Sequence, residues 1–197
     1  MSLHPDRVDF WEQRYRSGTT PWDFGGVPSR VTRYLESHHH GGEALIPGCG
    51  NGHEIEAFAD AGFNVTAIDL APTAVARARQ NLPPTLAERV LLGDFFTHDF
   101  SPAPFDLVYE RTFLCALPPE QRSAYVRRMA RLLKPGGTLV GFFVLGEECG
   151  GPPYYLNAGD DRRLFGHDFV LVNEERVAEP FPLFGDAERW REYRRAC

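Results

Sequence analysis

Three glycines at alternate positions, Gly48, Gly50 and Gly52, constrain this chain more than any other stretch. They follow directly on the apolar run Ala44-Leu45-Ile46, and a helix is predicted to begin at His53-Glu54. Glycines this close together let the backbone turn tightly and approach a ligand without a Cβ in the way. The spacing differs from the Gly-x-Gly-x-x-Gly fingerprint of nicotinamide dinucleotide sites. It predicts either a ligand cradle between a strand and a helix, or only a tight turn.

The composition is that of a globular protein. Charged residues make up 24% and apolar residues 43% of the 197 residues, which suits one domain with one core. No apolar run approaches the roughly 20 residues of a membrane span. The start, Met1-Ser-Leu-His-Pro-Asp, lacks the basic and apolar blocks of a signal peptide. We therefore expect a single domain over residues 1–197, a cytoplasmic location and no membrane partner.

The net charge argues against a nucleic-acid partner, and the spacing of the cysteines and histidines argues against a metal site. A net charge of −6 does not favour binding to a phosphate backbone, and the arginines of 122–131 read as the solvated face of a predicted amphipathic helix. The four cysteines form no Cys-x-x-Cys pair, so they are expected to be free thiols. His38-His39-His40 is interpreted as a solvated loop, because three adjacent residues do not converge as metal ligands. No metal site is expected.

Hydrophobic periodicity predicts alternating helices and strands, and therefore an α/β domain with three layers. The helices are expected over 5–16, 27–35, 53–61, 72–82, 118–133 and 160–165. The strands are expected over 44–46, 64–70, 89–92, 105–109, 138–145, 168–177 and 188–194. A turn, Lys134-Pro135-Gly136-Gly137, is expected to separate the fifth helix from the strand that follows it.

Two acids stand where predicted strands end. Asp69 lies 21 positions beyond Gly48, at the tip of the second strand, where a carboxylate can accept hydrogen bonds from both ribose hydroxyls of a bound nucleoside. It can equally be a surface acid that starts the next helix. Asp94 follows the third strand beside Phe95 and Phe96, so it can bind an adenine amino group while a ring packs on the base. The alternative for Asp94 is a turn residue.

Aromatic side chains are dense near the N-terminus. Phe10, Trp11 and Tyr15 fall at helical spacing, and Trp22 and Phe24 lie in the Gly/Pro-rich loop after them. The pattern is typical of a hydrophobic stripe that docks a helix on the domain. A tryptophan in such a loop also suits a ligand cover, because loops carry binding sites more often than they carry cores.

Together these residues resemble the class I S-adenosylmethionine-dependent methyltransferases, and within them the thiopurine and halide/thiol methyltransferase group. The superfamily features are the glycine loop, Asp69, Asp94 and the turn 134–137. The features more specific to the group are Phe10-Trp11-Glu12-x-x-Tyr15-x-x-Gly18-x-x-Pro21-Trp22-Asp23, Ile46-Pro47-Gly48-Cys49-Gly50, Thr112-Phe113-Leu114-Cys115-Ala116 and Gly150-Gly151-Pro152-Pro153-Tyr154.

The resemblance implies a Rossmann-like, mostly parallel sheet of seven strands in the order 3-2-1-4-5-7-6, with the last strand antiparallel. Residues 1–40 would form a helical, aromatic cover and 41–197 the core. The implied cofactor is S-adenosylmethionine, with S-adenosylhomocysteine as its product. The residues expected to bind it are Trp11, Tyr15, Trp22, Gly48, Cys49, Gly50, Gly52, Asp69, Leu70, Asp94, Phe95 and Glu110.

The implied reaction is methyl transfer to a small soft acceptor, a thiol or other sulfur compound or a halide. Separately, the protein is expected to be a monomer. Arg111 would attract an anionic acceptor and Tyr154 would line its pocket, with no obligatory base. The group's pattern is not fully kept. Tyr15 stands where the plant halide/thiol enzymes have tryptophan, and Glu110-Arg111 stands where they have aspartate-tyrosine and the thiopurine enzymes aspartate-arginine.

Three alternatives stay open at this point. Arg111 can merely pair with Glu110. The acceptor can be a hydroxyl or amine, with Glu110 as the base. The chain can also be a non-catalytic cofactor-binding module whose partner surface is the arginine-bearing helix.

Overall fold

The computed structural model of the chain describes residues 7–37, 41–101, 104–147 and 150–197. The expected loop at His38-His39-His40, the start of the first predicted helix at 5–6, and Cys149 lie outside the described residues. The chain divides into two compact units, Met1–Asp99 and Phe100–Cys197. The expectation of a single domain stays a prediction.

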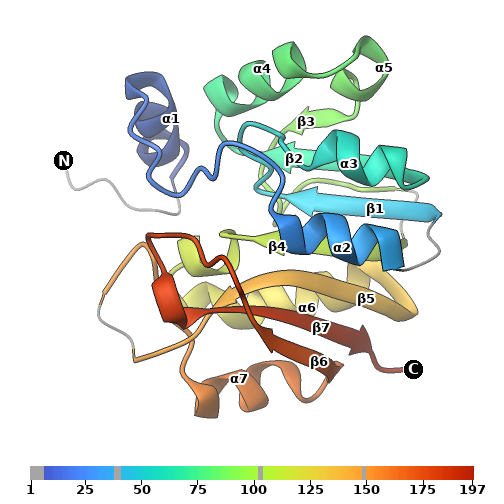
Figure 1. Cartoon of the computed structure of the whole chain (residues 1–197), viewed down its shortest axis with the longest axis vertical. Helices are drawn as coiled ribbons and strands as arrows, with labels where there is room; N and C mark the ends of the chain where they lie inside the picture. The colour runs from blue at the N-terminus through green and yellow to red at the C-terminus, as the bar shows by residue number, and fades with distance from the viewer. Residues whose placement is uncertain (1–6, 38–40, 102–103, 148–149) are drawn as a thin grey trace. The chain divides into compact units, whose positions relative to one another are not determined.

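Figure 1 labels the elements, and every predicted helix and strand is present with its bounds moved by a few residues. The first unit contains α1 (Val8–Ser17), α2 (Ser29–Ser37), β1 (Gly42–Pro47), α3 (Ile55–Asp60), β2 (Phe63–Asp69), α4 (Pro72–Asn81), α5 (Pro84–Ala87) and β3 (Val90–Leu92). The second contains β4 (Phe105–Arg111), the 3-10 turns η1 (Leu114–Ala116) and η2 (Pro119–Gln121), α6 (Arg122–Leu132), β5 (Leu133–Val144), α7 (Ala158–Phe165), β6 (Phe169–Arg176), η3 (Gly185–Ala187) and β7 (Glu188–Arg195).

The seven strands follow the order β3-β2-β1-β4-β5-β7-β6, which confirms the predicted order. In the first unit β1 is parallel to β2, and β2 is parallel to β3. In the second, β4 is parallel to β5, and β7 is antiparallel to both β5 and β6. The prediction of an antiparallel last strand is therefore also confirmed.

The first unit is built so that its parallel strands end beside the glycine loop. The last four residues of β1, Ala44 to Pro47, are buried or nearly so, which is typical of a strand covered on both faces. Proline at the first position begins α4, and α5 begins the same way at Pro84. The short helix α5 was not predicted, because no element was expected between the helix over 72–82 and the strand over 89–92. Figure 1 shows α1 beside α4, and the two helices are in contact.

The second unit is organised on β5, which pairs with β4 on one side and β7 on the other. The predicted turn at 134–137 lies inside β5, because Leu133 already pairs with Phe105 before the register shifts at Leu107. The Trp190 side chain on β7 is fully buried and packs edge-on against Phe142, with ring centroids 5.1 Å apart.

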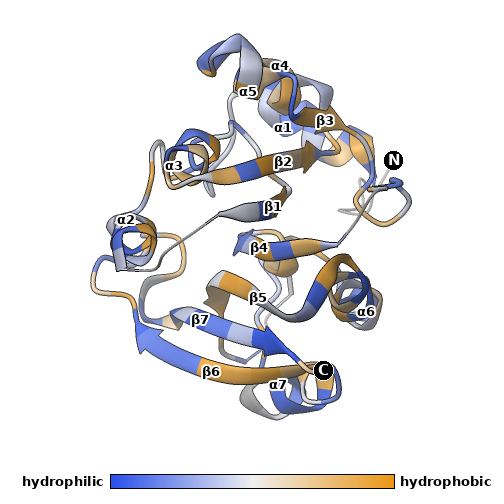
Figure 2. Ribbon diagram, turned by 90° about the vertical axis from the view of Figure 1, so that its right-hand side faces the viewer, coloured by the Kyte–Doolittle hydropathy of each residue, from blue (hydrophilic) through white to orange (hydrophobic). Residues whose placement is uncertain are grey.

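Strand β6 ends the sheet order, and it changes character along its length. Figure 2 shows an apolar beginning and a hydrophilic end. Val170, Leu171 and Val172 are 58%, 42% and 49% exposed, which fits an edge strand that is open to solvent beyond its buried first residue, Phe169. Within the described residues, no helix is both long enough and apolar enough to cross a membrane.

Candidate functional site

The glycine loop of the first unit has a backbone that only glycine adopts easily. Gly48, Gly50 and Gly52 have φ values of 61°, 54° and 75°, all in the left-handed region. A Cβ on Gly50 would lie 2.8 Å from the Tyr15 hydroxyl oxygen, and one on Gly52 would lie 2.9 Å from the Cβ of Ala78. The loop is therefore packed between α1 and α4, and both contacts require a missing side chain.

Asp69 fixes this loop to the end of β2. Its Oδ2 accepts a hydrogen bond from the Gly50 amide at 2.9 Å, and its Oδ1 accepts one from the Ala71 amide at 2.8 Å. The carboxylate is buried, and that burial raises its pKa. Each carboxylate oxygen has two lone pairs, so Asp69 retains acceptor capacity for a ligand's hydroxyl groups.

The three predicted cover aromatics pack together at the same loop. The rings of Trp11 and Trp22 are 5.2 Å apart and those of Tyr15 and Trp22 are 5.9 Å apart, both edge-on. The Trp22 indole nitrogen donates to the Tyr15 hydroxyl at 3.4 Å. Burial raises the pKa of Tyr15, which keeps its hydroxyl neutral. Ala71 and Ala74 complete the cluster, so it is anchored on the start of α4.

Asp23 joins the cover loop to the glycine loop, and sequence analysis did not identify it as a site residue. Its Oδ1 lies 2.8 Å from His53 Nε2, and its Oδ2 accepts a hydrogen bond from Asn51 Nδ2. The hydrogen bond to His53 is the main reason that the pKa of Asp23 is lowered to about 2. Asp23 stands in the Pro21-Trp22-Asp23 stretch, which was the only available signal.

Glu12 makes a second polar attachment of the cover. Its Oε2 accepts from the Thr73 amide at 2.8 Å and its Oε1 from the Thr73 hydroxyl at 2.7 Å. Thr73 lies in the first turn of α4, where amide groups lack partners within the helix and a nearby negative charge is favourable. Glu12 therefore docks α1 on α4 across 61 positions of sequence.

Asp94 makes the local contacts of a turn residue. Its Oδ1 accepts from the Phe96 amide at 2.8 Å, and its carbonyl oxygen accepts from His98 at 2.8 Å. Phe95 is buried and packs edge-on against Phe96 with centroids 5.3 Å apart. A contact of Asp94 and Phe95 with adenine stays a prediction, as does one of Leu70, which is half-buried directly after Asp69.

In the second unit, Glu110 is fully buried and is held by three donors. Its Oε1 accepts from the amides of Phe113 at 2.9 Å and Leu114 at 2.8 Å, and its Oε2 accepts from the Tyr125 hydroxyl at 2.6 Å. Burial raises the pKa of Glu110 to about 7. These bonds hold the turn between β4 and η1, where Thr112 has a φ of 56°. A contact between Glu110 and the cofactor stays a prediction.

Arg111 faces a different carboxylate from the one expected. Its Nη1 lies 3.7 Å from Oε1 of Glu188 on β7, whereas Glu110 is bound to its own three donors. The guanidinium carbon lies 4.5 Å from the centre of the Phe142 ring and 5.8 Å from that of Phe181. The expected alternative of an Arg111–Glu110 pair is therefore wrong. Arg111 and Glu110 are adjacent residues of one strand, and the side chains of adjacent strand residues point to opposite faces.

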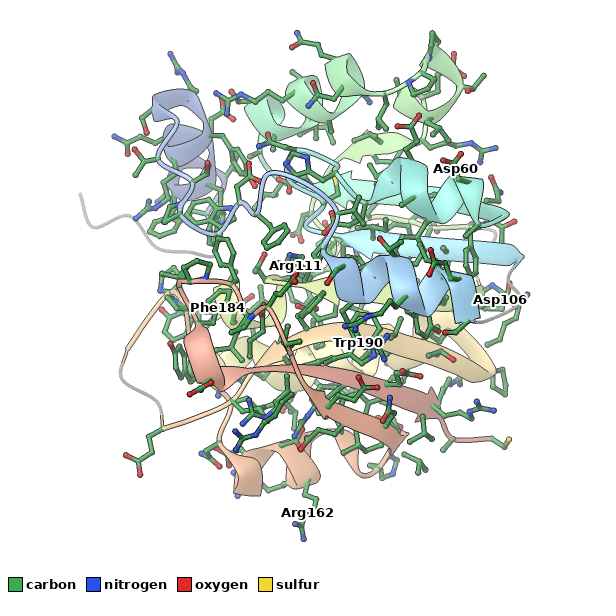
Figure 3. The ribbon with its side chains drawn as sticks, viewed as in Figure 1. Asp60, Asp106, Arg111, Arg162, Phe184 and Trp190 are labelled. Atoms are coloured by element: carbon green, nitrogen blue, oxygen red, sulfur yellow. The ribbon has the colours of Figure 1, made fainter. Side chains whose placement is uncertain are left out.

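A small pocket lies beside these charges in the second unit. Tyr154 is among its lining residues, and the Tyr154 amide donates to the Cys115 carbonyl oxygen at 2.7 Å, which ties the Tyr154 loop to η1. The role of Tyr154 in binding the acceptor stays a prediction. The lining residues are Glu110, Leu114, Cys115, Phe142, Phe143, Val144, Tyr154 and Leu156. Figure 3 labels Arg111, Phe184 and Trp190 among the side chains of this unit.

Comparison with known proteins identifies the family. The family described as Thiopurine S-methyltransferase (TPMT) matches residues 6–182. The chain belongs to the thiopurine S-methyltransferase family. It is therefore an S-adenosylmethionine-dependent methyltransferase, as the residue motifs predicted.

Two sequence relatives and one solved structure are similar to most of the chain. Probable thiol methyltransferase 2 of Arabidopsis thaliana is 34% identical over 191 residues, covering 92% of this chain and 84% of that protein. Thiopurine S-methyltransferase of Vibrio parahaemolyticus is 28% identical over 197 residues, covering 88% and 89%. The crystal structure of 1,6-didemethyltoxoflavin-N1-methyltransferase from Burkholderia thailandensis has a TM-score of 0.76 at 21% identity, covering 95% and 86%. This last likeness shows the Rossmann-like methyltransferase fold.

The residues of the first unit fit the methyl donor of the thiopurine S-methyltransferase family. Left-handed glycines, a buried strand-end acid and clustered aromatic rings suit a nucleoside that carries a cationic sulfur. Asn51 adds a group that sequence analysis missed. Its Oδ1 is buried and accepts no hydrogen bond from the described part of the chain. It is thus an available acceptor at the glycine loop.

The described residues do not provide a metal site. Across 7–37, 41–101, 104–147 and 150–197, no group of three His, Cys, Asp or Glu side chains is arranged to hold a metal ion. Cys49 and Cys115 are buried free thiols and Cys197 is an exposed one. Burial raises the pKa of both buried thiols, so they remain protonated.

Proposed function

We propose that this chain transfers the methyl group of S-adenosylmethionine to a small soft acceptor, first of all a sulfur compound and secondly a halide. The observation that carries the proposal is the packing of the aromatic cover on the glycine loop, where the Tyr15 hydroxyl stands over Gly50. Aromatic faces beside a ligand cradle suit a cationic sulfur better than they suit an uncharged nucleoside.

The first unit supplies the residues that bind the methyl donor in this proposal. Asp69 accepts hydrogen bonds from the ribose hydroxyls, while Asp94 and Phe95 contact the adenine. Trp11, Tyr15 and Trp22 face the sulfonium, and each cation–π contact contributes about 0.5–2 kcal/mol. Gly48, Cys49, Gly50, Gly52 and Leu70 form the cradle, and Glu110 of the second unit is retained as a further predicted contact. When bound, the donor supplies a methyl group that is already electrophilic.

The second unit supplies the residues that bind the acceptor. Arg111 attracts it and Tyr154 lines its pocket. No base is required for a thiolate, a thiocyanate or a halide, because orientation and exclusion of water can supply about 7–11 kcal/mol. The three donors on Glu110 count against its acting as a base for a hydroxyl or amine. The relatives named for thiols and thiopurines support a sulfur acceptor.

The proposal includes a cytoplasmic monomer that acts on a small molecule, without a nucleic-acid or membrane partner. Two buried free thiols, Cys49 and Cys115, support a reducing compartment, where unpaired thiols persist. Gel filtration with light scattering gives the oligomeric state directly.

The experiment is a methyl-transfer assay with S-adenosylmethionine labelled in its methyl group. The acceptors are a thiol, hydrosulfide, thiocyanate, a thiopurine and iodide, with a phenol and an amine as contrasts. We expect labelled product from at least one sulfur acceptor and the rate to rise with the fraction of thiolate. Turnover confined to the phenol or amine would overturn the sulfur assignment. Calorimetric binding of S-adenosylhomocysteine without turnover of any acceptor would indicate a binding module.

A further inference from the structure

The second unit contains a charge pair that is taken almost completely out of water. The side chains of Arg111 and Glu188 are 9% and 1% exposed, and Nη1 and Oε1 lie 3.7 Å apart. That distance is too long for a direct hydrogen bond but within the range of an ion pair. Burying two charges costs several kcal/mol per ion unless each compensates the other. A pair kept in this position therefore needs a reason other than stability.

Glu188 has one oxygen anchored and one oxygen directed at Arg111. Oε2 accepts a hydrogen bond from the Phe181 amide at 2.8 Å. Oε1 is buried and accepts no hydrogen bond from any residue that the structure describes. Both members of the pair contact Phe181, which belongs to an apolar cluster with Cys115, Val144 and Phe184. The negative charge of Glu188 therefore acts chiefly on the Arg111 guanidinium.

This pair shares its walls with the pocket that we propose for the acceptor. The Arg111 guanidinium lies over the Phe142 ring, and Phe142, Cys115 and Val144 all line the pocket. The pKa of the Cys115 thiol shows which charges act on that side of the pocket. Burial and the charge of Glu110 raise the pKa of its thiol, Glu188 raises it further, and Arg111 lowers it. A sulfur atom placed beside Cys115 is exposed to the same opposing charges.

We propose that Glu188 is a specificity-determining residue, which offsets part of the charge of Arg111 and so weakens the preference of the pocket for permanent anions over thiols. Glu188 acts through Arg111 and does not itself react. The inference rests on the proposed function, because it assigns the acceptor to the pocket beside Arg111. It narrows the acceptor class from soft nucleophiles in general to thiols, which bind in the neutral form and lose their proton to solvent before the thiolate sulfur accepts the methyl group.

Electrostatics sets the expected size of the effect. A unit charge several ångströms from the acceptor, at an effective dielectric constant of about 20, changes anion binding by roughly tenfold or more. Removing the Glu188 charge should strengthen binding of an anion by that factor. It should leave the binding of an uncharged thiol nearly unchanged, because a neutral ligand has no Coulomb interaction with the altered field.

The test compares thiocyanate, which is an anion at every assay pH, with 2-mercaptoethanol at pH 6.5, where that thiol is almost entirely neutral. Glu188→Gln should raise kcat/KM for thiocyanate about tenfold relative to kcat/KM for the thiol. Calorimetry should show a matching gain in thiocyanate affinity without turnover. Glu188→Asp keeps the charge and should retain the original preference. Glu192→Gln makes the same chemical change on β7 and should not alter it.

A second variant keeps the test decisive if Glu188→Gln does not fold. Arg111→Gln leaves Glu188 as an uncompensated charge and should weaken thiocyanate binding about tenfold relative to the thiol. If the ratio of kcat/KM for thiocyanate to kcat/KM for the thiol stayed unchanged in the folded variants, the role of Glu188 would be overturned. The proposed function would still stand, because both acceptors would be methylated. Absence of methylation of every sulfur acceptor and of iodide by the unmodified protein, with cofactor binding intact, would instead overturn the proposed function.

Discussion

The two units of this molecule organise their candidate residues in different ways. In the first unit the acid at the end of β2 is bound to backbone, since Asp69 accepts from the amides of Gly50 and Ala71. In the second unit charged side chains face one another in the interior, as Arg111 faces Glu188. Backbone contacts fix a shape that suits one invariant ligand. Buried charges determine the electrostatic potential around them, and a single substitution can change that potential. This contrast suits a fixed methyl donor and a variable acceptor.

Gly141 offers the severest test of the second unit. A Cβ there would lie 1.8 Å from the Glu110 carbonyl oxygen, and its φ is +150°. We expect Gly141→Ala to cost about 4 kcal/mol or more of unfolding free energy, because backbone must move to make room. Chemical denaturation measures it. Gly136→Ala on the same strand has a φ of +76° but open space, so it should cost only about 1–2 kcal/mol. If both variants lost the same unfolding free energy, backbone strain at positive φ, and not the clash of the new Cβ, would determine the cost.

Glu110 should make the stability of the second unit depend on pH. Burial raises its pKa from 4.5 to about 7, so the folded state holds a proton that the unfolded state releases. The stabilisation is present below pH 4.5 and is lost as pH rises through 7. The loss approaches about 3 kcal/mol. Glu110→Gln should flatten the profile of unfolding free energy between pH 5 and 8. A parallel profile in the variant would assign the pH dependence to another group.

Gly50 is the corresponding test of the first unit. Its φ is +54°, and an added Cβ would meet the Tyr15 hydroxyl at 2.8 Å. Gly50→Ala should weaken S-adenosylhomocysteine binding by about 2 kcal/mol, because the loop and the aromatic cover both shift. Calorimetry measures the change. Gly26→Ala, where no atom lies within 4 Å of the new Cβ, is the matched control and should bind normally. If Gly50→Ala bound S-adenosylhomocysteine normally, the contact between Gly50 and the aromatic cover would not be part of the cofactor site.

Asp23 should have the smallest effect of the four. Asp23→Asn removes the carboxylate that holds Asn51 and His53, so the cover loop should detach more often. Loss of such contacts costs about 1 kcal/mol, which corresponds to roughly a fivefold rise in KM for the methyl donor at unchanged kcat. Asp9→Asn alters an exposed acid on the same segment and serves as the control. A fall in kcat without a change in KM would contradict the positioning role.

Local pattern was enough to predict the helices, the strands and the glycine loop, whereas the strand order came from the resemblance to the methyltransferase family. Strand periodicity and the spacing from Gly48 to Asp69 define contacts within one βαβ segment, where sequence neighbours are also neighbours in space. Even so, Leu133 joined β5 ahead of the predicted turn, because pairing with Phe105 outweighed the local Pro-Gly signal. Turn residues can be tolerated at the irregular start of a strand.

The polar contacts of the two units were much less predictable. Glu12 meets Thr73 across 61 positions, and Glu188 meets Arg111 from β7, which places them together only after the chain has folded. Single-sequence periodicity contains no signal for such partners. The alternative in which Arg111 pairs with Glu110 has a different cause, because adjacent residues of a strand point to opposite faces and Arg111 faces Glu188 instead.

The central claim is that the first unit binds the methyl donor and the second selects the acceptor. Two-substrate steady-state kinetics with thiocyanate on Asp69→Ala and Arg111→Gln tests it most directly. Asp69→Ala should raise KM for the donor by an amount equivalent to about 1–3 kcal/mol and leave KM for the acceptor unchanged. Arg111→Gln should do the reverse, raising KM for thiocyanate alone. A rise in donor KM in Arg111→Gln, with thiocyanate KM unaffected, would contradict this division between the two units.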